Sequence, residues 1–170
     1  MGFIQSGDYD ILLIPYGHWV ENWYTESEFK FGIQQFVALG GGVIFTGYSG
    51  WDYGVFENAY YTAYQSGSTT TYDTDYFDED HPIMEGVGNE ISSYRRYMFC
   101  VYDEADEDLI EIFNAEYNGH DCSHVVFAKE FGMGRVVVIG STYQFTTYED
   151  MDKILGNSVK WVTESYFTLT

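Results

Sequence analysis

Two stretches of the sequence decide the fold: YDILLIP at residues 9–15 and GGGVIFTG at residues 40–47. Their runs of apolar residues are typical of strands buried on both faces of a parallel sheet. Between them, Thr25 and Glu28 form a capping box that predicts the start of a helix, and the glycines from Gly40 predict its end. Strand, helix and strand together indicate a right-handed βαβ unit.

The rest of the chain is predicted to continue this α/β pattern. We expect strands over 97–102 and 109–115, a hairpin of strands 125–130 and 135–139, and a last helix from Thr147. A short helix over 58–64 and polar or acidic loops over 66–72, 73–80 and 103–108 complete the prediction.

These elements predict one α/β domain over residues 1–170, a three-layer sandwich with a mostly parallel sheet and an antiparallel edge near the C-terminus. The chain enters its first strand at Tyr9 without the strand and helix that usually open such a sheet. We therefore expect the first β-α unit to be lacking and the domain to be excised from a longer protein.

The charge and the hydropathy pattern of the chain together exclude two classes of partner. Asp and Glu number 27 against 7 Lys and Arg, a formal net charge of −20, which repels nucleic-acid phosphates. The sequence contains no run of about 18 apolar residues, so it does not predict a membrane-spanning helix. The remaining partners are proteins, small molecules or carbohydrates. An acidic decoy for a basic partner is one function that fits the charge. The compartment is undetermined, with an extracellular setting favoured over the cytoplasm.

Cys100 and Cys122 are the two cysteines, and their spacing matches no zinc motif. As a disulfide they would contribute about 3 kcal/mol in the chain-entropy model. As free thiols they would be two small buried hydrophobic residues. Both alternatives remain open.

Five segments, in this order, resemble the class I glutamine amidotransferase-like superfamily, most closely its non-amidotransferase branches. They are YDILLIP at 9–15, FVALGGGVIFTGYSG at 36–50, HPIMEGV at 81–87, KEFGMGRVVVIGS at 129–141 and NSVKWV at 157–162. The resemblance implies a flavodoxin-like fold. It also implies a nucleophilic cysteine after the strand at 43–47, and a histidine and an acid after the strand at 136–139.

The sequence departs from this catalytic pattern. Gly47-Tyr48-Ser49-Gly50 contains no cysteine, and 143–149 contains no histidine, although Glu149 could be the acid. The resemblance therefore implies a catalytically degenerate branch, and we expect a non-catalytic module for binding or assembly. The alternative is a hydrolase with Ser49 as nucleophile, His18 as base and a carboxylate such as Glu149 as orienter.

Aromatic side chains follow both predicted parallel strands, at the edge where open α/β sheets bind ligands. They could stack on sugar rings or anchor a protein partner, or the loops could simply be packed by their own aromatics. The candidate ligand-binding residues are Trp19, Trp23, Tyr48, Trp51 and Tyr53.

An acidic run offers a candidate calcium site. Its carboxylates would be supplied by Asp73, Asp75, Asp78 and Asp80. Calcium prefers several carboxylate oxygens, but the spacing fails the EF-hand pattern. The alternative interpretation is a solvated acidic loop.

Overall fold

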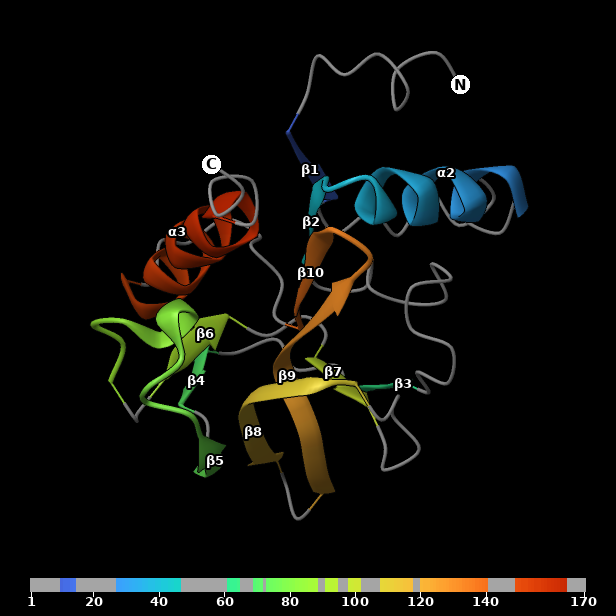
Figure 1. Ribbon diagram of the computed structural model, residues 1–170. Helices are drawn as coiled ribbons and strands as arrows, with labels where there is room; N and C mark the ends of the chain where they lie inside the picture. Colours follow the sequence, from blue (N-terminus) through green and yellow to red (C-terminus); the bar gives the residue numbers. More distant parts are fainter. Residues whose placement is uncertain are drawn as a thin grey trace.

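The computed structural model describes residues 10–14, 27–46, 61–64, 69–71, 73–88, 91–94, 98–101, 108–117, 120–140 and 149–164 (Figure 1). The elements are β1 (Ile11–Ile14), α2 (Ser27–Ala38), β2 (Gly42–Thr46), β3 (Tyr61–Tyr64), β4 (Thr69–Thr71), β5 (Asp73–Phe77), η2 (Pro82–Met84), β6 (Ser92–Tyr94), β7 (Met98–Val101), β8 (Ile110–Tyr117), β9 (His120–Phe131), β10 (Gly134–Ile139) and α3 (Glu149–Thr163).

The main sheet is mixed, with the strand order β1-β2-β10-β9-β8-β5. β1, β2 and β10 run parallel to one another, and the pairs β10–β9, β9–β8 and β8–β5 are antiparallel. The predicted βαβ unit, hairpin and antiparallel edge are therefore confirmed. The antiparallel part extends further than predicted, because β8 and β5 join it.

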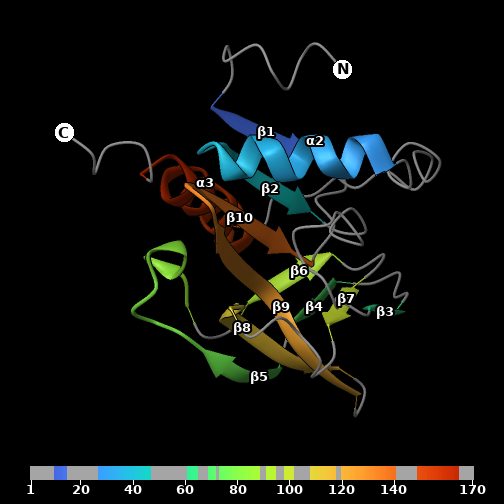
Figure 2. The same cartoon turned by 45° about the vertical axis from the view of Figure 1, so that its right-hand side comes forward.

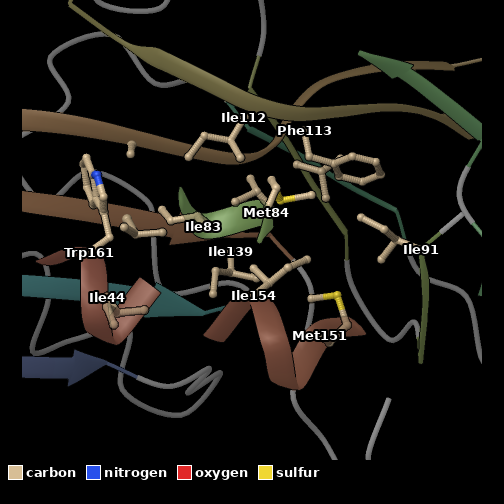
Figure 3. Packing of buried hydrophobic residues seen from close by; sticks show 14 of the residues in the cluster. Ile44, Ile83, Met84, Ile91, Ile112, Phe113, Ile139, Met151, Ile154 and Trp161 are labelled. Carbon is tan, nitrogen blue, oxygen red and sulfur yellow. The ribbon is translucent and has the colours of Figure 1, made fainter. Parts of the chain in front are cut away.

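Alternate residues of the parallel strands pack against different helices, as the two-residue period of a strand requires. Val43 and Phe45 of β2 belong to the apolar cluster of α2, which includes Ile33 and Val37. Ile44, between them, belongs to the cluster of α3. Figure 3 shows this second cluster, where Ile139 and Ile154 lie close to Ile83 and Met84 of η2. The two helices thus cover opposite faces of β2.

The end of α2 is held by the hairpin turn between β9 and β10. Gly40, with φ +107, breaks the helix, and Met133 N–H donates to the Ala38 carbonyl at 3.1 Å. Gly132 and Gly134 lie so close to the backbone of α2 and its C-terminal turn that a Cβ at either position would overlap it. Glycine therefore allows the hairpin to pack directly on the end of the helix.

The opposite helix, α3, is attached to η2. The buried Asn157 amide donates to the carbonyls of Ile83 and Glu85, at 3.1 and 2.9 Å. Ile83 and Met84 are buried in the same cluster as the inner face of α3. The segment HPIMEGV is therefore a turn, as predicted, and also part of the core.

Three predictions of local structure are wrong. The helix expected over 58–64 is strand β3 from Tyr61, and the loops expected over 66–72 and 73–80 contain β4 and β5. Each strand pairs with a partner distant in the sequence: β3 with β7, β4 with β6 and β5 with β8. Pairing with distant strands determines the structure of these segments, and the local composition does not predict that pairing.

Candidate functional site

The candidate site is the edge of the sheet at which the parallel strands end. Ile14 pairs with Phe45, and Ile139 pairs with Thr46, so β1, β2 and β10 reach this edge at the same level. Segments that follow three adjacent parallel strands start side by side there. This edge is where open α/β sheets place their ligands.

Seven of the predicted site residues belong to the segments that follow β1 and β2. They are His18, Trp19, Trp23, Tyr48, Ser49, Trp51 and Tyr53, and they lie outside the described residues. The two strands that precede them are adjacent and parallel, as the sequence predicts. The Ser49–His18 pair and the aromatic ligand site remain predictions.

Glu149, the candidate acid, is the first residue of α3. Val162, at the other end of the helix, lies close to Gly42, where β2 begins, so α3 runs opposite to β2 and starts near its carboxyl end. The Glu149 carboxylate lies 2.9 Å from Lys153 Nζ on the helix surface. A hydrogen bond from Lys153, together with its charge, holds the pKa of Glu149 below the ordinary value.

The acidic run predicted as a calcium site begins in a strand. Asp73 and Asp75 lie in β5, which pairs with β8 through an irregularity between Thr74 and Tyr76. Asp78 stabilises the turn that follows, because its Oδ1 accepts from the Asp80 N–H at 3.2 Å. Among the described residues, no group of three or more His, Cys, Asp or Glu is placed to hold a metal ion. The side chains of Asp73 and Asp75 lie outside that description, so the calcium site remains a prediction.

The two cysteines lie in neighbouring strands. Cys100 is in β7 opposite Thr62, and Cys122 is in β9 opposite Ala115. β7 packs against β9. The cysteine side chains lie outside the described residues, so the disulfide also stays a prediction.

A cluster that no sequence pattern predicts lies at the other end of α3. The Trp161 ring lies 4.6 Å from the Arg135 guanidinium carbon and 5.4 Å from the His81 ring. Arg135 also donates to the Trp161 carbonyl at 2.8 Å and pairs with Glu130 at 3.0 Å. A cation that binds the last carbonyls of a helix stabilises its C-terminus. The sequence shows the motifs HPIMEGV and GRVV, which contain His81 and Arg135, but it does not predict that both residues lie beside Trp161.

His81 has a structural role within this cluster. Its Nδ1 accepts from the Ile83 N–H at 3.2 Å and so caps η2. Burial lowers the pKa of His81 below 6.5; Asp78 opposes this and Arg135 adds to it. His81 and Glu149 are at opposite ends of α3, about 18 Å apart along a helix axis at 1.5 Å per residue. They cannot act together as acid and base.

The fold is similar to that of ThuA-like proteins. One from Bacteroides uniformis superposes with a TM-score of 0.67 and 11% identity, covering 91% of this chain and 69% of that one. A cytoplasmic protein of Salmonella typhimurium gives 0.61 and 13%, covering 91% and 72%. ThuA-like proteins have the class I glutamine amidotransferase-like fold, so the resemblance is confirmed at the level of fold.

The same fold is similar to part of a larger enzyme. A β-galactosidase of Bacillus circulans superposes with a TM-score of 0.62 and 14% identity, over 93% of this chain and 24% of that one. No protein-family profile matches the sequence, and no curated protein sequence matches it. None of the described helices has the length and hydropathy needed to cross a membrane.

Proposed function

We propose that this chain is a non-catalytic, amidotransferase-like module for binding or assembly within a larger protein. The observation that carries the proposal is the chemistry of the edge where β2 and β10 end. The four residues after β2 are GYSG, and residues 140–148 after β10 contain neither cysteine nor histidine. The positions at which the superfamily's enzymes carry their nucleophile and base therefore hold other residues.

Among the strands that the structure describes, β1 forms the edge of the parallel half, and this supports a role inside a larger assembly. β1 has the four successive apolar residues of an interior strand, yet it lies at the end of the strand order. Leu13 is 48% exposed. By contrast, β5 at the other edge has the sequence DTDYF, and charges on an edge strand oppose unwanted pairing.

We infer that in the full three-layer, flavodoxin-like sandwich β1 is an interior strand, beside a first β-α unit that the described residues do not include. Ile11 packs in the cluster of α3, and Leu13 follows it on the same face of the strand by the two-residue period. A further helix beside α3 would cover that exposed leucine. The β-galactosidase likeness supports the same idea, because a fold of this kind makes up about a quarter of that chain.

The binding surface in this proposal is the aromatic edge, with Trp19, Trp23, Tyr48, Trp51 and Tyr53. Aromatic rings bind sugars and anchor protein partners with little loss of side-chain entropy. A glycan array of neutral oligosaccharides tests the sugar alternative. Trp51→Ala should lower the affinity for a retained glycan at least ten-fold, whereas Tyr76→Ala, an exposed aromatic of β5, should not.

The absence of catalysis is tested directly. We would measure ammonia release from glutamine and hydrolysis of p-nitrophenyl acetate by the unmodified chain and by Ser49→Ala and His18→Ala. All three proteins should match the buffer background. Turnover by the unmodified chain that is lost in folded Ser49→Ala would show a serine hydrolase and overturn the proposal.

A further inference from the structure

The outer face of α2 is apolar, although the helix already buries an apolar inner face. Ile33 and Val37 are fully buried against the sheet. On the opposite side, Phe31 and Leu39 are 57% and 74% exposed, with the exposed Gln35 between them at four-residue spacing. A helix that is apolar on both sides is normally buried on both sides.

The hairpin turn enlarges this face. Met133 is 57% exposed, and its N–H is bonded to the carbonyl of Ala38, the residue before Leu39. We call Phe31, Gln35, Leu39 and Met133 the α2 outer face. Neither view of the ribbon shows a described helix or strand over the outer side of α2 (Figures 1 and 2). Its three large apolar side chains present roughly 300 Å², the size at which a patch on a monomer is often functional.

This face carries no charge in a chain of net charge −20. Residues 31–42 and 131–134 contain no Asp, Glu, Lys, Arg or His, and the nearest charged residues on the N-terminal side are Glu28 and Lys30 in the first turn of α2. A charged partner would therefore find a residue of opposite charge only at the N-terminal end of the face, in the first turn of α2. The complementary surface must itself be apolar and uncharged.

We infer that the α2 outer face is the contact between two copies of this chain, related by a two-fold axis. In such a dimer each patch faces the same patch of its partner, so an apolar, uncharged face meets its own complement. The acids elsewhere on the two copies repel each other, but salt screens them beyond about 8 Å at physiological ionic strength. The inference stands whether or not the module is catalytic.

The size of the face sets the strength of the dimer. A stable interface buries about 800 Å² on each partner, more than this face alone offers. We therefore expect a weak dimer, with a dissociation constant on the order of 10–100 µM. Because the contact is apolar while the net charges repel, added salt should strengthen the dimer.

Sedimentation equilibrium of the full chain tests this inference. The concentrations would span about tenfold below to tenfold above the expected dissociation constant, at about 50 and 500 mM NaCl. Leu39→Glu and the milder Leu39→Gln are the test variants. Val159→Glu is the matched control, because Val159 is an exposed apolar residue on the surface of α3 and the substitution adds the same charge. Circular dichroism confirms that each variant is folded.

The inference predicts a monomer–dimer equilibrium that tightens in high salt. Each substitution occurs twice in a two-fold dimer, so Leu39→Glu should raise the dissociation constant at least ten-fold and Leu39→Gln several-fold. Val159→Glu should leave it within about two-fold. A chain that is monomeric at every concentration and salt overturns the inference. So does a dimer that is insensitive to Leu39→Glu or weakened by salt, since its contact would then be elsewhere.

Discussion

Helices α2 and α3 pack on opposite faces of β2, yet they present opposite surfaces to their surroundings. The outer side of α3 carries exposed charges, among them Glu149, Asp152 and Lys160. The outer side of α2 carries Phe31 and Leu39. Both inner faces follow the same rule, because each buries a stripe of apolar side chains against the sheet. Amphipathic α3 presents mainly charged and polar side chains to water, whereas α2 presents large apolar side chains on the side that faces away from the sheet.

The two helices also differ in how closely backbone approaches them. The hairpin turn packs on the backbone of α2 and the turn that follows it through glycines, so neither position has space for a side chain. α3 is instead joined to η2 and β10 by side chains, through Asn157 and Arg135. The α2 side depends on steric fit to the backbone, whereas the α3 side combines specific polar contacts with the close approach of Val162 to Gly42.

The largest expected effect tests the steric half of this comparison. Gly134→Ala places a Cβ against the carbonyl oxygens of Val37 and Gly41, which are backbone atoms that cannot move away cheaply. We expect a loss of about 3 kcal/mol or more in the free energy of unfolding, measured by urea denaturation.

Gly156→Ala on α3 is the matched control for that substitution. A Cβ there meets nothing within 4 Å, and alanine is the better helix former. The variant should gain roughly 0.5–1 kcal/mol. If both alanine variants had similar stability, the close packing of the hairpin on α2 would not hold the structure together.

A smaller effect tests the polar half. Asn157→Ala removes both donors to the carbonyls of Ile83 and Glu85 and leaves them without this partner in a buried region. We expect a loss of about 1–3 kcal/mol in the free energy of unfolding. Gln35→Ala, on the exposed side of α2, should stay within about 0.5 kcal/mol of the unmodified chain. Equal losses in the two variants would contradict the assignment of Asn157 as a specific attachment.

These cases show which parts of the fold the sequence predicts. The buried strands β2 and β10 and the stripe of α3 are visible because each is a local pattern of apolar residues. The hydrogen bond from Asn157 to Ile83 cannot be predicted from the sequence, because it joins residues that are distant along the chain. For the same reason β3 and β5 are predicted wrongly: their partner strands lie elsewhere in the sequence.

The candidate site divides in the same way. The sequence predicts which strand ends share an edge, because parallel strands in a βαβ unit must end together. It did not predict that Arg135, Trp161 and His81 come together at the far end of α3, because each residue comes from a different element. Local spacing contains no signal for such a cluster.

Acidification should lower the free energy of unfolding through protonation of His81, which lies on the α3 side. Burial lowers the pKa of His81 in the folded state below the unfolded value of 6.5, so the unfolded chain binds the extra proton at higher pH. The free energy of unfolding should therefore fall as the pH drops through 6.5 towards the lowered pKa, and the loss is complete below it. Protonation also places a proton on Nδ1, which can then no longer accept from the Ile83 N–H.

His81→Asn isolates this effect, because asparagine still offers an acceptor to cap η2 but does not titrate in this range. Urea denaturation at about pH 7.5 and 5.5, on either side of the ordinary histidine pKa, compares the two proteins. The unmodified chain should lose stability on acidification, and His81→Asn should lose less. An identical pH dependence would mean that His81 is not the group responsible.

The smallest effect concerns the charged outer face of α3 itself. Lys153→Ala breaks the pair with Glu149, whose pKa the lysine lowers first by its hydrogen bond and then by its charge. NMR titration should show the Glu149 pKa rising towards its ordinary value. The free energy of unfolding should not change measurably, because both groups are exposed and water screens the pair. A clear loss of stability would mean that the ion pair stabilises α3 despite its exposure, and that the outer surface of α3 is more than a solvated charged face.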